Sequence, residues 1–201
     1  MTHWRSAAVS LAALIALSVA TAAPAGASTE MAGAGTVELA FTPGDAIDAR
    51  IVAAIDAAER EVLVLAFAFT QPKLARALAA AHARGVTVEI VADRGQTLEL
   101  PQSAVPALAR SGIAVWLDGN FGNAHNKVIV VDAMLPRATT VTGSYNFTVA
   151  AQTKNAENVA IFRDNPEVAR AYRAYFKRLQ AKAARWDGGD APPGRAPRPR
   201  R

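Results

Sequence analysis

The chain has 201 residues, of which 51% are hydrophobic, and it carries a formal net charge of +5 with no cysteine. This length and apolar content suffice for one domain with a sizeable core and leave little room for a second. The lack of cysteine excludes a disulfide scaffold, thiol catalysis and cysteine metal sites, and a core of this size can hold the chain together without disulfides.

Residues 1–27 are typical of a secretory signal peptide. His3 and Arg5 form a polar start, residues 7–20 an apolar segment, and Ala25-Gly26-Ala27 a small-residue cleavage site. The apolar segment of about 14 residues is short for a membrane span, which needs about 20. Export to the periplasm or out of the cell is therefore predicted, with an uncleaved N-terminal anchor as the alternative.

After a linker at residues 28–36, apolar runs alternate with helical patterns, and we expect one folded domain over residues 37–186. In this first part strands are expected at 37–41, 62–69, 86–91 and 113–117, and helices at 47–58, 72–84 and 103–110. Asp45 is expected to cap the first helix. The alternation predicts an α/β fold in which a mixed, mainly parallel β-sheet is flanked by helices on both faces.

The second part of the domain continues with strands at 125–132, 139–142 and 158–162 and an amphipathic helix from Pro166 to about residue 185. Ten residues separate Asp132 from Gly143, and the proline among them indicates a lengthened hairpin loop between two strands.

The C-terminal segment, residues 187–201, is rich in proline and arginine and is predicted to be disordered. Residues 177–201 carry eight Lys or Arg against two Asp, so the excess positive charge of the chain belongs to this end. The tail is either an electrostatic tether for nucleic acid or anionic membrane, or a solvated segment without a function.

The strand at 125–132 contains four consecutive β-branched residues, Val128 to Val131, and is expected to be buried. Because side chains alternate along a strand, His125 and Lys127 are predicted to point the same way and Asp132 the other way. Asp132 is therefore expected to have a structural task, in which it bonds to backbone or to a basic partner.

Ser144 and Asn146 are also two residues apart, and they follow Gly143, which would let a backbone N–H come close to a ligand. Together with Lys127 these groups suit the oxygens of a phosphate. His125 is then available for nucleophilic attack or proton transfer.

The spacing His-x-Lys-x-x-x-x-Asp, followed by Gly-Ser-x-Asn, resembles the signature of the phospholipase D superfamily. The single copy of this motif, the segment Asn-Ala-Glu-Asn at 155–158 and the short exported chain resemble its small bacterial endonucleases, over residues 37–186. The resemblance implies that Glu157 hydrogen-bonds the catalytic imidazole, which would fix its tautomer. It also implies that two chains with one motif each form a homodimer.

A covalent route through histidine needs one imidazole to attack phosphorus and a second to protonate the leaving oxygen. The chain has one suitable histidine, so a two-fold homodimer that brings two copies of His125 together is expected. A phosphohistidine intermediate follows, with no metal and no other cofactor. The predicted catalytic residues are His125, Lys127, Asp132 and Glu157, and the predicted phosphate-binding residues are Lys127, Gly143, Ser144 and Asn146.

A non-specific endonuclease that acts on DNA, with RNA as a further substrate, is the first functional hypothesis. The second is a phospholipase D that acts on phospholipid headgroups, which would need an apolar entrance such as Phe121 in the loop before the motif. A nucleic-acid-binding module without catalysis is the third. We expect the aromatic residues Phe67, Phe69 and Trp116 to belong to the core rather than to stack on bases.

Overall fold

A computed structural model describes residues 28, 30, 31 and 33–190. The predicted signal peptide and residues 191–201 of the predicted tail lie outside the described residues. The chain divides into a unit at Met1–Glu30 and a unit at Met31–Arg201, and the fold belongs to the second. No helix in the described part of the chain is long and apolar enough to cross a membrane.

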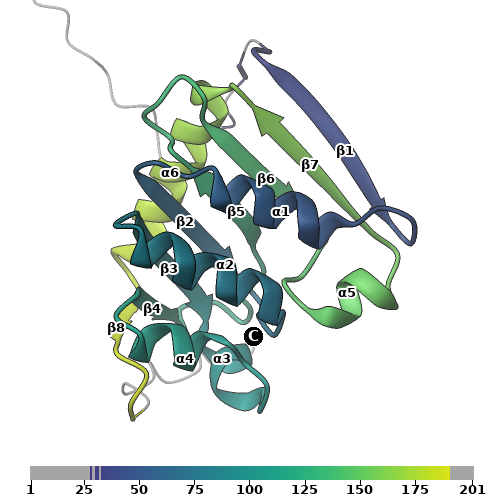
Figure 1. The fold of residues 1–201 in the computed structure, drawn as a ribbon. Coiled ribbons are helices and arrows are strands. Elements are labelled where there is room, and N and C mark those ends of the chain that lie inside the picture. Colours follow the sequence, from purple (N-terminus) through teal and green to yellow (C-terminus); the bar gives the residue numbers. More distant parts are fainter. Residues whose placement is uncertain (1–27, 29, 32, 191–201) are drawn as a thin grey trace, which may run out of the picture. The chain divides into compact units, whose positions relative to one another are not determined.

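The second unit is built on an eight-stranded sheet with the strand order β1-β7-β6-β5-β2-β3-β4-β8 (Figure 1). The strands are β1 (Thr36–Thr42), β2 (Glu61–Ala66), β3 (Thr87–Asp93), β4 (Ala114–Asp118), β5 (Lys127–Val131), β6 (Thr139–Gly143), β7 (Glu157–Arg163) and β8 (Ala184–Trp186). Five of the seven neighbouring pairs are antiparallel, and only β2–β3 and β3–β4 are parallel. The sheet is mixed, as predicted, but the expectation of a mainly parallel sheet is wrong.

The strand directions were predicted wrongly because an apolar run in the sequence indicates burial of a strand and not its direction. A continuous run such as β5 shows that both faces of a strand are covered, and it does not show the direction of the neighbouring strand. Helical crossovers join β2 to β3 and β3 to β4, so these pairs are parallel. The short connection of residues 132–138 makes β5 and β6 an antiparallel hairpin, which confirms the predicted hairpin loop.

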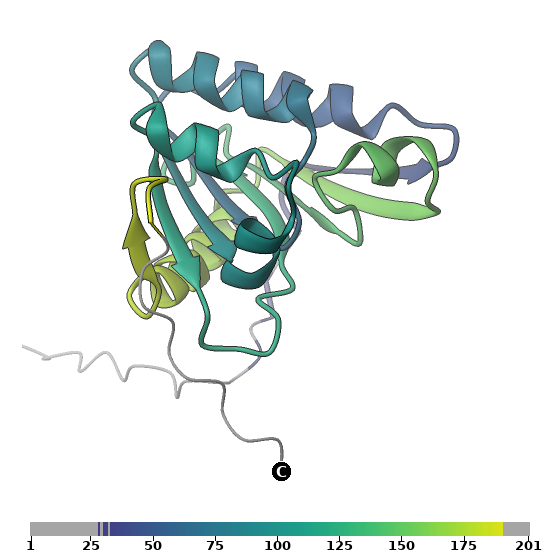
Figure 2. The same ribbon diagram turned by 90° about the horizontal axis from the view of Figure 1, so that it is seen from below.

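Helices cover both faces of the sheet, as predicted (Figures 1 and 2). The helices are α1 (Ile47–Asp56), α2 (Pro72–Ala83), α3 (Arg94–Glu99), α4 (Val105–Arg110), α5 (Val149–Thr153) and α6 (Pro166–Gln180). The larger core cluster joins α1, α2 and α4 to one face of the sheet, and a smaller cluster joins α6 to the other face. Within that smaller cluster α6 packs on the side chains of β2, β3 and β5.

Several short elements were not predicted from the sequence. They are α3, α5 and β8, and the last helix ends at Gln180 rather than near residue 185. Asp45 does not cap α1, because its carboxylate accepts the backbone N–H of Phe41 at 2.9 Å. The strand predicted to run to residue 69 ends at Ala66, and the chain after it turns toward the loop that precedes β5.

Candidate active site

The residues of the motif meet at one end of the sheet. His125 lies just before β5 and Lys127 is its first residue, while Ser144 follows β6 and Glu157 begins β7. These three strands are neighbours in antiparallel pairs, so the start of β5 lies beside the end of β6 and the start of β7. Residues separated by up to 32 positions in sequence are thereby brought to one edge.

His125 and Lys127 contact each other directly, which confirms that they point the same way. The ammonium Nζ of Lys127 lies 2.8 Å from Nδ1 of His125 and donates to the backbone oxygen of His125 at 3.1 Å. Lys127 is 6% exposed, whereas the imidazole of His125 is open to solvent. An ammonium can only donate, so Nδ1 is the acceptor in this contact, and the ring proton is then on Nε2, the nitrogen left to face a substrate.

Burial of the Lys127 side chain lowers the pKa of its ammonium, and the negative charge of Glu157 opposes that shift. A buried cation favours a nearby anion, because charge interactions strengthen where water is excluded. Lys127 is thus suited to hold a phosphate oxygen next to the imidazole of His125.

Glu157 occupies a different position from the one expected. Its Oε2 accepts the hydroxyl of Ser144 at 2.5 Å, and its Oε1 accepts the amide of Asn155 at 2.9 Å. Among the hydrogen bonds of the described residues, none joins Glu157 to His125. Strand β6 separates β7 from β5, which puts their backbones about 10 Å apart. The expected carboxylate–imidazole hydrogen bond is therefore not made, and Glu157 acts on the site through Ser144 and through its charge.

Gly143 and Ser144 are held tightly against β7. The Ser144 hydroxyl accepts the backbone N–H of Asn158 at 3.1 Å, and the Ser144 N–H donates to the Asn158 oxygen at 3.1 Å. A Cβ at Gly143 would lie 2.2 Å from that same oxygen. The glycine is thus required by the close approach of β7, and the approach of a ligand to its backbone stays a prediction.

Asn146 is positioned by the segment that follows β2. The backbone N–H groups of Thr70 and Gln71 both donate to the Phe147 oxygen, at 2.8 and 2.9 Å. The rings of Phe69 and Phe147 pack edge to face with centroids 5.6 Å apart. The side-chain Oδ1 of Asn146 is buried without a hydrogen-bond partner among the described residues. A buried polar atom of this kind calls for an explanation, and at Asn146 a bound ligand could supply the partner.

Asp132 lies at the opposite end of β5 from His125. Its carboxylate accepts the backbone N–H groups of Glu59, Arg60 and Glu61, at 2.8, 2.7 and 2.9 Å. The side chain is 5% exposed, and the residue has a positive φ of 52°. Asp132 therefore ties the loop before β2 to the end of β5, in agreement with the structural task inferred from strand alternation.

Phe67 was expected in the core but borders the site. Its ring centroid is 4.3 Å from that of the His125 imidazole, and the Lys127 ammonium lies 4.8 Å from its centroid. Its backbone N–H donates to the Asn126 oxygen at 2.9 Å. Only the pairing of β2 with β5 places it there, and that pairing is not visible in the sequence. Phe69 is buried in the core, as predicted.

Asp93 is a second residue that the sequence did not single out. It ends β3, and its carboxylate accepts the N–H of Gln96 at 2.8 Å and the N–H of Ala124 at 2.7 Å. The side chain is 6% exposed. One buried carboxylate thus caps α3 and holds the turn that precedes His125. The role of Asp93 was not predicted, because the six-residue helix that it caps is too short to be recognised in the sequence.

The domain model described as "Cardiolipin synthase, PLD-like domain" matches residues 51–180, which include the whole motif. The chain belongs to the phospholipase D superfamily. A protein of Rickettsia felis named "Phospholipase D" is 40% identical over 136 residues, which are 68% of this chain and 65% of that protein. The "Mitochondrial cardiolipin hydrolase" of Xenopus laevis is 35% identical over 135 residues, or 67% of this chain and 61% of its own length.

Among solved structures of the superfamily, Nuc from Salmonella typhimurium is similar with a TM-score of 0.68 and 33% identity. The similarity covers 75% of this chain and 97% of Nuc. NucT from Helicobacter pylori has the same TM-score with 23% identity, covering 75% of this chain and 99% of NucT, and supports the fold alone. The described residues contain no group of three or more His, Cys, Asp or Glu that could hold a metal ion.

Proposed function

We propose that the protein is an exported, metal-independent phosphodiesterase that hydrolyses DNA, with RNA as a further substrate. The contact that carries this proposal is the buried ammonium of Lys127 against an exposed imidazole, at the sheet end that also holds Ser144 and Asn146. A cation and neutral donors around one point suit a phosphodiester, and the imidazole supplies the reacting nitrogen.

In the proposed reaction the Lys127 ammonium moves from Nδ1 of His125 to a phosphate oxygen, and the ring proton shifts from Nε2 to Nδ1. Nε2 of one His125 then attacks phosphorus, and the P–O bond to the leaving oxygen breaks. A second imidazole gives its proton to that oxygen, so a phosphohistidine and an alcohol are formed. Water, deprotonated by the second imidazole, then attacks phosphorus and releases the first His125. Lys127, Ser144 and Asn146 stabilise the negative charge that develops on the phosphoryl oxygens.

The reaction needs two imidazoles, and each chain brings one to the site. The other described histidine, His82, lies in the last turn of α2, next to Gly112 in the turn between α4 and β4. It therefore does not belong to the candidate site. A homodimer with two-fold symmetry completes the site, because the symmetry axis places His125 of one copy opposite His125 of the other. Activity should therefore depend on protein concentration below the dissociation constant of the dimer.

Two observations bear on the substrate. The match to Nuc spans nearly all of that chain, and the basic C-terminal segment would attract a polyanion. Phospholipid is the second candidate substrate, because the Rickettsia and Xenopus relatives are named for lipid hydrolysis and Phe121, in the loop before His125, is 53% exposed. The third functional hypothesis is a protein that binds DNA without cleaving it.

The test is degradation of plasmid DNA by the purified protein in EDTA, with His125→Ala beside it and His82→Ala as the matched control. We expect the unmodified protein and His82→Ala to degrade the plasmid and His125→Ala to leave it intact. If none degrades DNA, the same three proteins should be tested on phosphatidylcholine vesicles, and release of choline only by the two proteins with His125 would favour the phospholipase. Inhibition by EDTA would contradict the metal-independent route.

A further inference from the structure

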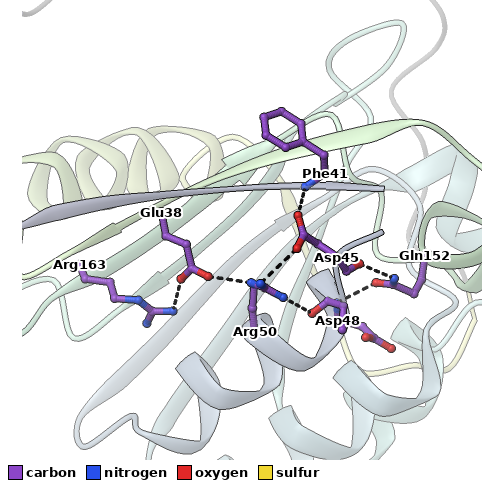
Figure 3. Close-up of polar contacts among 8 residues, drawn as sticks. Glu38, Phe41, Asp45, Asp48, Arg50, Gln152 and Arg163 are labelled. Atoms are coloured by element: carbon purple, nitrogen blue, oxygen red, sulfur yellow. Dashed lines mark hydrogen bonds and ion pairs between the residues drawn. The ribbon is translucent and has the colours of Figure 1, made fainter. Parts of the chain in front are cut away.

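Several cations in the described part of the chain are already matched by carboxylates. Arg50 and Arg163 share the carboxylate of Glu38, at 2.7 and 2.9 Å (Figure 3). On α6, Arg173 pairs with Glu61 at 2.9 Å. A cation in such an ion pair attracts an external anion weakly, because the neighbouring negative charge opposes that attraction.

Three successive cations at the end of α6 and on β8 are different. Arg178, Lys182 and Arg185 are all exposed, and no acidic residue lies between them in the sequence. Among the described residues, no carboxylate forms an ion pair with any of the three. The positive charge of this segment is therefore available to an anion.

The Arg185 side chain is fixed in place although it is exposed. Its guanidinium carbon lies 4.8 Å from the centroid of the Trp116 ring. Its Nη1 donates to the backbone oxygens of Val115 and Trp186, at 2.9 and 3.1 Å. Its Nε and Nη2 make no hydrogen bond with the described residues, so the N–H groups on that edge are free. A guanidinium edge of this kind matches two oxygens of a phosphate, and it loses little freedom on binding because it is already held.

Aromatic rings support two of the three cations. The guanidinium carbon of Arg178 lies 5.3 Å from the centroid of the Tyr175 ring, as that of Arg185 lies over Trp116. Both rings pack with their other parts against the smaller core cluster. We use the name α6–β8 surface for these rings and cations, which are Trp116, Tyr175, Arg178, Lys182 and Arg185. Cations combined with aromatic rings are typical of surfaces that follow the backbone of a nucleic acid.

The α6–β8 surface is connected to the candidate active site. The side-chain amide of Asn120 donates to the backbone oxygen of Lys182 at 2.8 Å, and Asn120 lies in the loop that leads to His125. Strand β8 lies at the edge of the sheet beside β4 and is the fourth strand from β5 (Figure 1). At about 4.8 Å per strand the separation is about 19 Å, which about five or six nucleotides span at roughly 3.4 Å each. One bound strand can therefore reach both places.

We propose that the α6–β8 surface binds the phosphates of the substrate strand about five nucleotides away from the phosphodiester at His125. The inference rests on the proposed function and makes a polynucleotide the substrate class, since a phospholipid headgroup or a dinucleotide is too short to reach both places. The contact raises the affinity for long substrates and leaves the chemical step unchanged, because the surface does not touch the reacting atoms.

The test compares Lys182→Gln and Arg185→Gln with the unmodified protein, and Arg137→Gln is the matched control. Arg137 carries the same charge, has a side chain that is 83% exposed, and pairs with Glu59 beyond the far end of β5. Binding of a fluorescent single-stranded oligonucleotide of about 12 nucleotides is measured by anisotropy at several salt concentrations. These binding measurements use proteins that also carry His125→Ala, so that the oligonucleotide stays intact.

One phosphate contact contributes about 0.7 to the slope of log Kd against log salt, or about fivefold in affinity between about 1 M and about 0.1 M salt. We therefore expect Lys182→Gln and Arg185→Gln each to raise Kd about fivefold at about 0.1 M salt and to lower the slope by about 0.7. With His125 intact, KM for the oligonucleotide should rise about fivefold at constant kcat. Hydrolysis of a thymidine dinucleotide should keep its kcat/KM, and Arg137→Gln should alter none of these values.

The outcomes separate this inference from the proposed function. Cleavage of DNA with Kd, KM and salt slope unchanged in both variants would overturn the surface and leave the nuclease standing. Weaker oligonucleotide binding by both variants, with no phosphodiester cleaved by the unmodified protein, would support the surface and overturn the function. Weaker binding to phosphatidylglycerol vesicles, with oligonucleotide binding unchanged, would overturn the inference and assign the surface to an anionic membrane. Lys182→Gln alone decides if thermal unfolding shows that Arg185→Gln, which also loses two hydrogen bonds, does not fold.

Discussion

Replacing Asp132 by alanine should destabilise the protein without reducing the activity of the folded molecules. The carboxylate accepts three backbone N–H groups, from Glu59, Arg60 and Glu61. Each would lose its acceptor, at a cost of about 1 kcal/mol where water can replace part of the bond, so the loss is about 3 kcal/mol. At about 2–4 °C per kcal/mol for a domain of this size, the loss of these three hydrogen bonds alone should lower the Tm by about 6–12 °C.

The backbone at Asp132 adds a second effect that needs its own control. Its φ of 52° is left-handed, which alanine tolerates less well than aspartate. Asp164 has a nearly equal φ of 54° and is exposed to solvent in the turn before α6. Asp164→Ala should therefore report the backbone effect alone, about 1 kcal/mol or about 2–4 °C. The difference between the two variants is the contribution of the three hydrogen bonds.

The assay is thermal unfolding followed by circular dichroism, combined with initial rates of plasmid cleavage at 25 °C. Asp132 is seven residues from His125 along an extended strand, or about 20 Å at roughly 3.3 Å per residue. Rates per folded molecule should therefore equal those of the unmodified protein. Asp132→Ala would refute this reasoning if it melted together with Asp164→Ala, or if it lost activity while fully folded.

Three further variants test the surroundings of the catalytic pair. Glu157→Gln removes a negative charge that raises the pKa of Lys127, so this pKa should fall further. The alkaline limb of the kcat/KM profile should then move to lower pH. An unmoved limb would contradict the role of Lys127 in that limb. Asp93→Asn keeps one acceptor oxygen and loosens the turn at Ala124, so kcat should fall roughly tenfold with little change in KM; equal changes in both would argue against a positioning role. Phe67→Leu removes both ring contacts, worth about 0.5–2 kcal/mol, and its cost should be seen as a lower kcat rather than a lower Tm.

The local parts of the site could be predicted from the sequence because they depend on strand alternation. The contact between His125 and Lys127 follows from a period of two residues. The remote position of Asp132 follows from the extended strand that lies between it and His125. The partner of Glu157 could not be predicted, because it depends on which strand lies between β7 and β5. The positions of Phe67 and Asp93 depend on pairings of β2 and β3 with segments distant in sequence.

The fold was predictable to a similar depth. Long periodic elements such as α2 and α6 were predicted, and Gly85 follows the C-cap of α2 with a φ of +88°, which glycine adopts readily. The direction of most strands was not predictable, since burial on both faces gives the same apolar run in parallel and antiparallel neighbours. Helices of five or six residues, such as α3 and α5, have too few turns to give a period.

The order of the strands also has a consequence for how the site is assembled during folding. Strands β5, β6 and β7 form a meander of neighbours in sequence, and they carry His125, Ser144 and Glu157. Strand β2, which brings Phe67 against the imidazole, pairs with β5 across a loop of about 60 residues, and closing such a loop is slow compared with forming a hairpin. The residues proposed to bind phosphate can therefore come together early, while the imidazole acquires its final orientation only when the distant strand has been inserted.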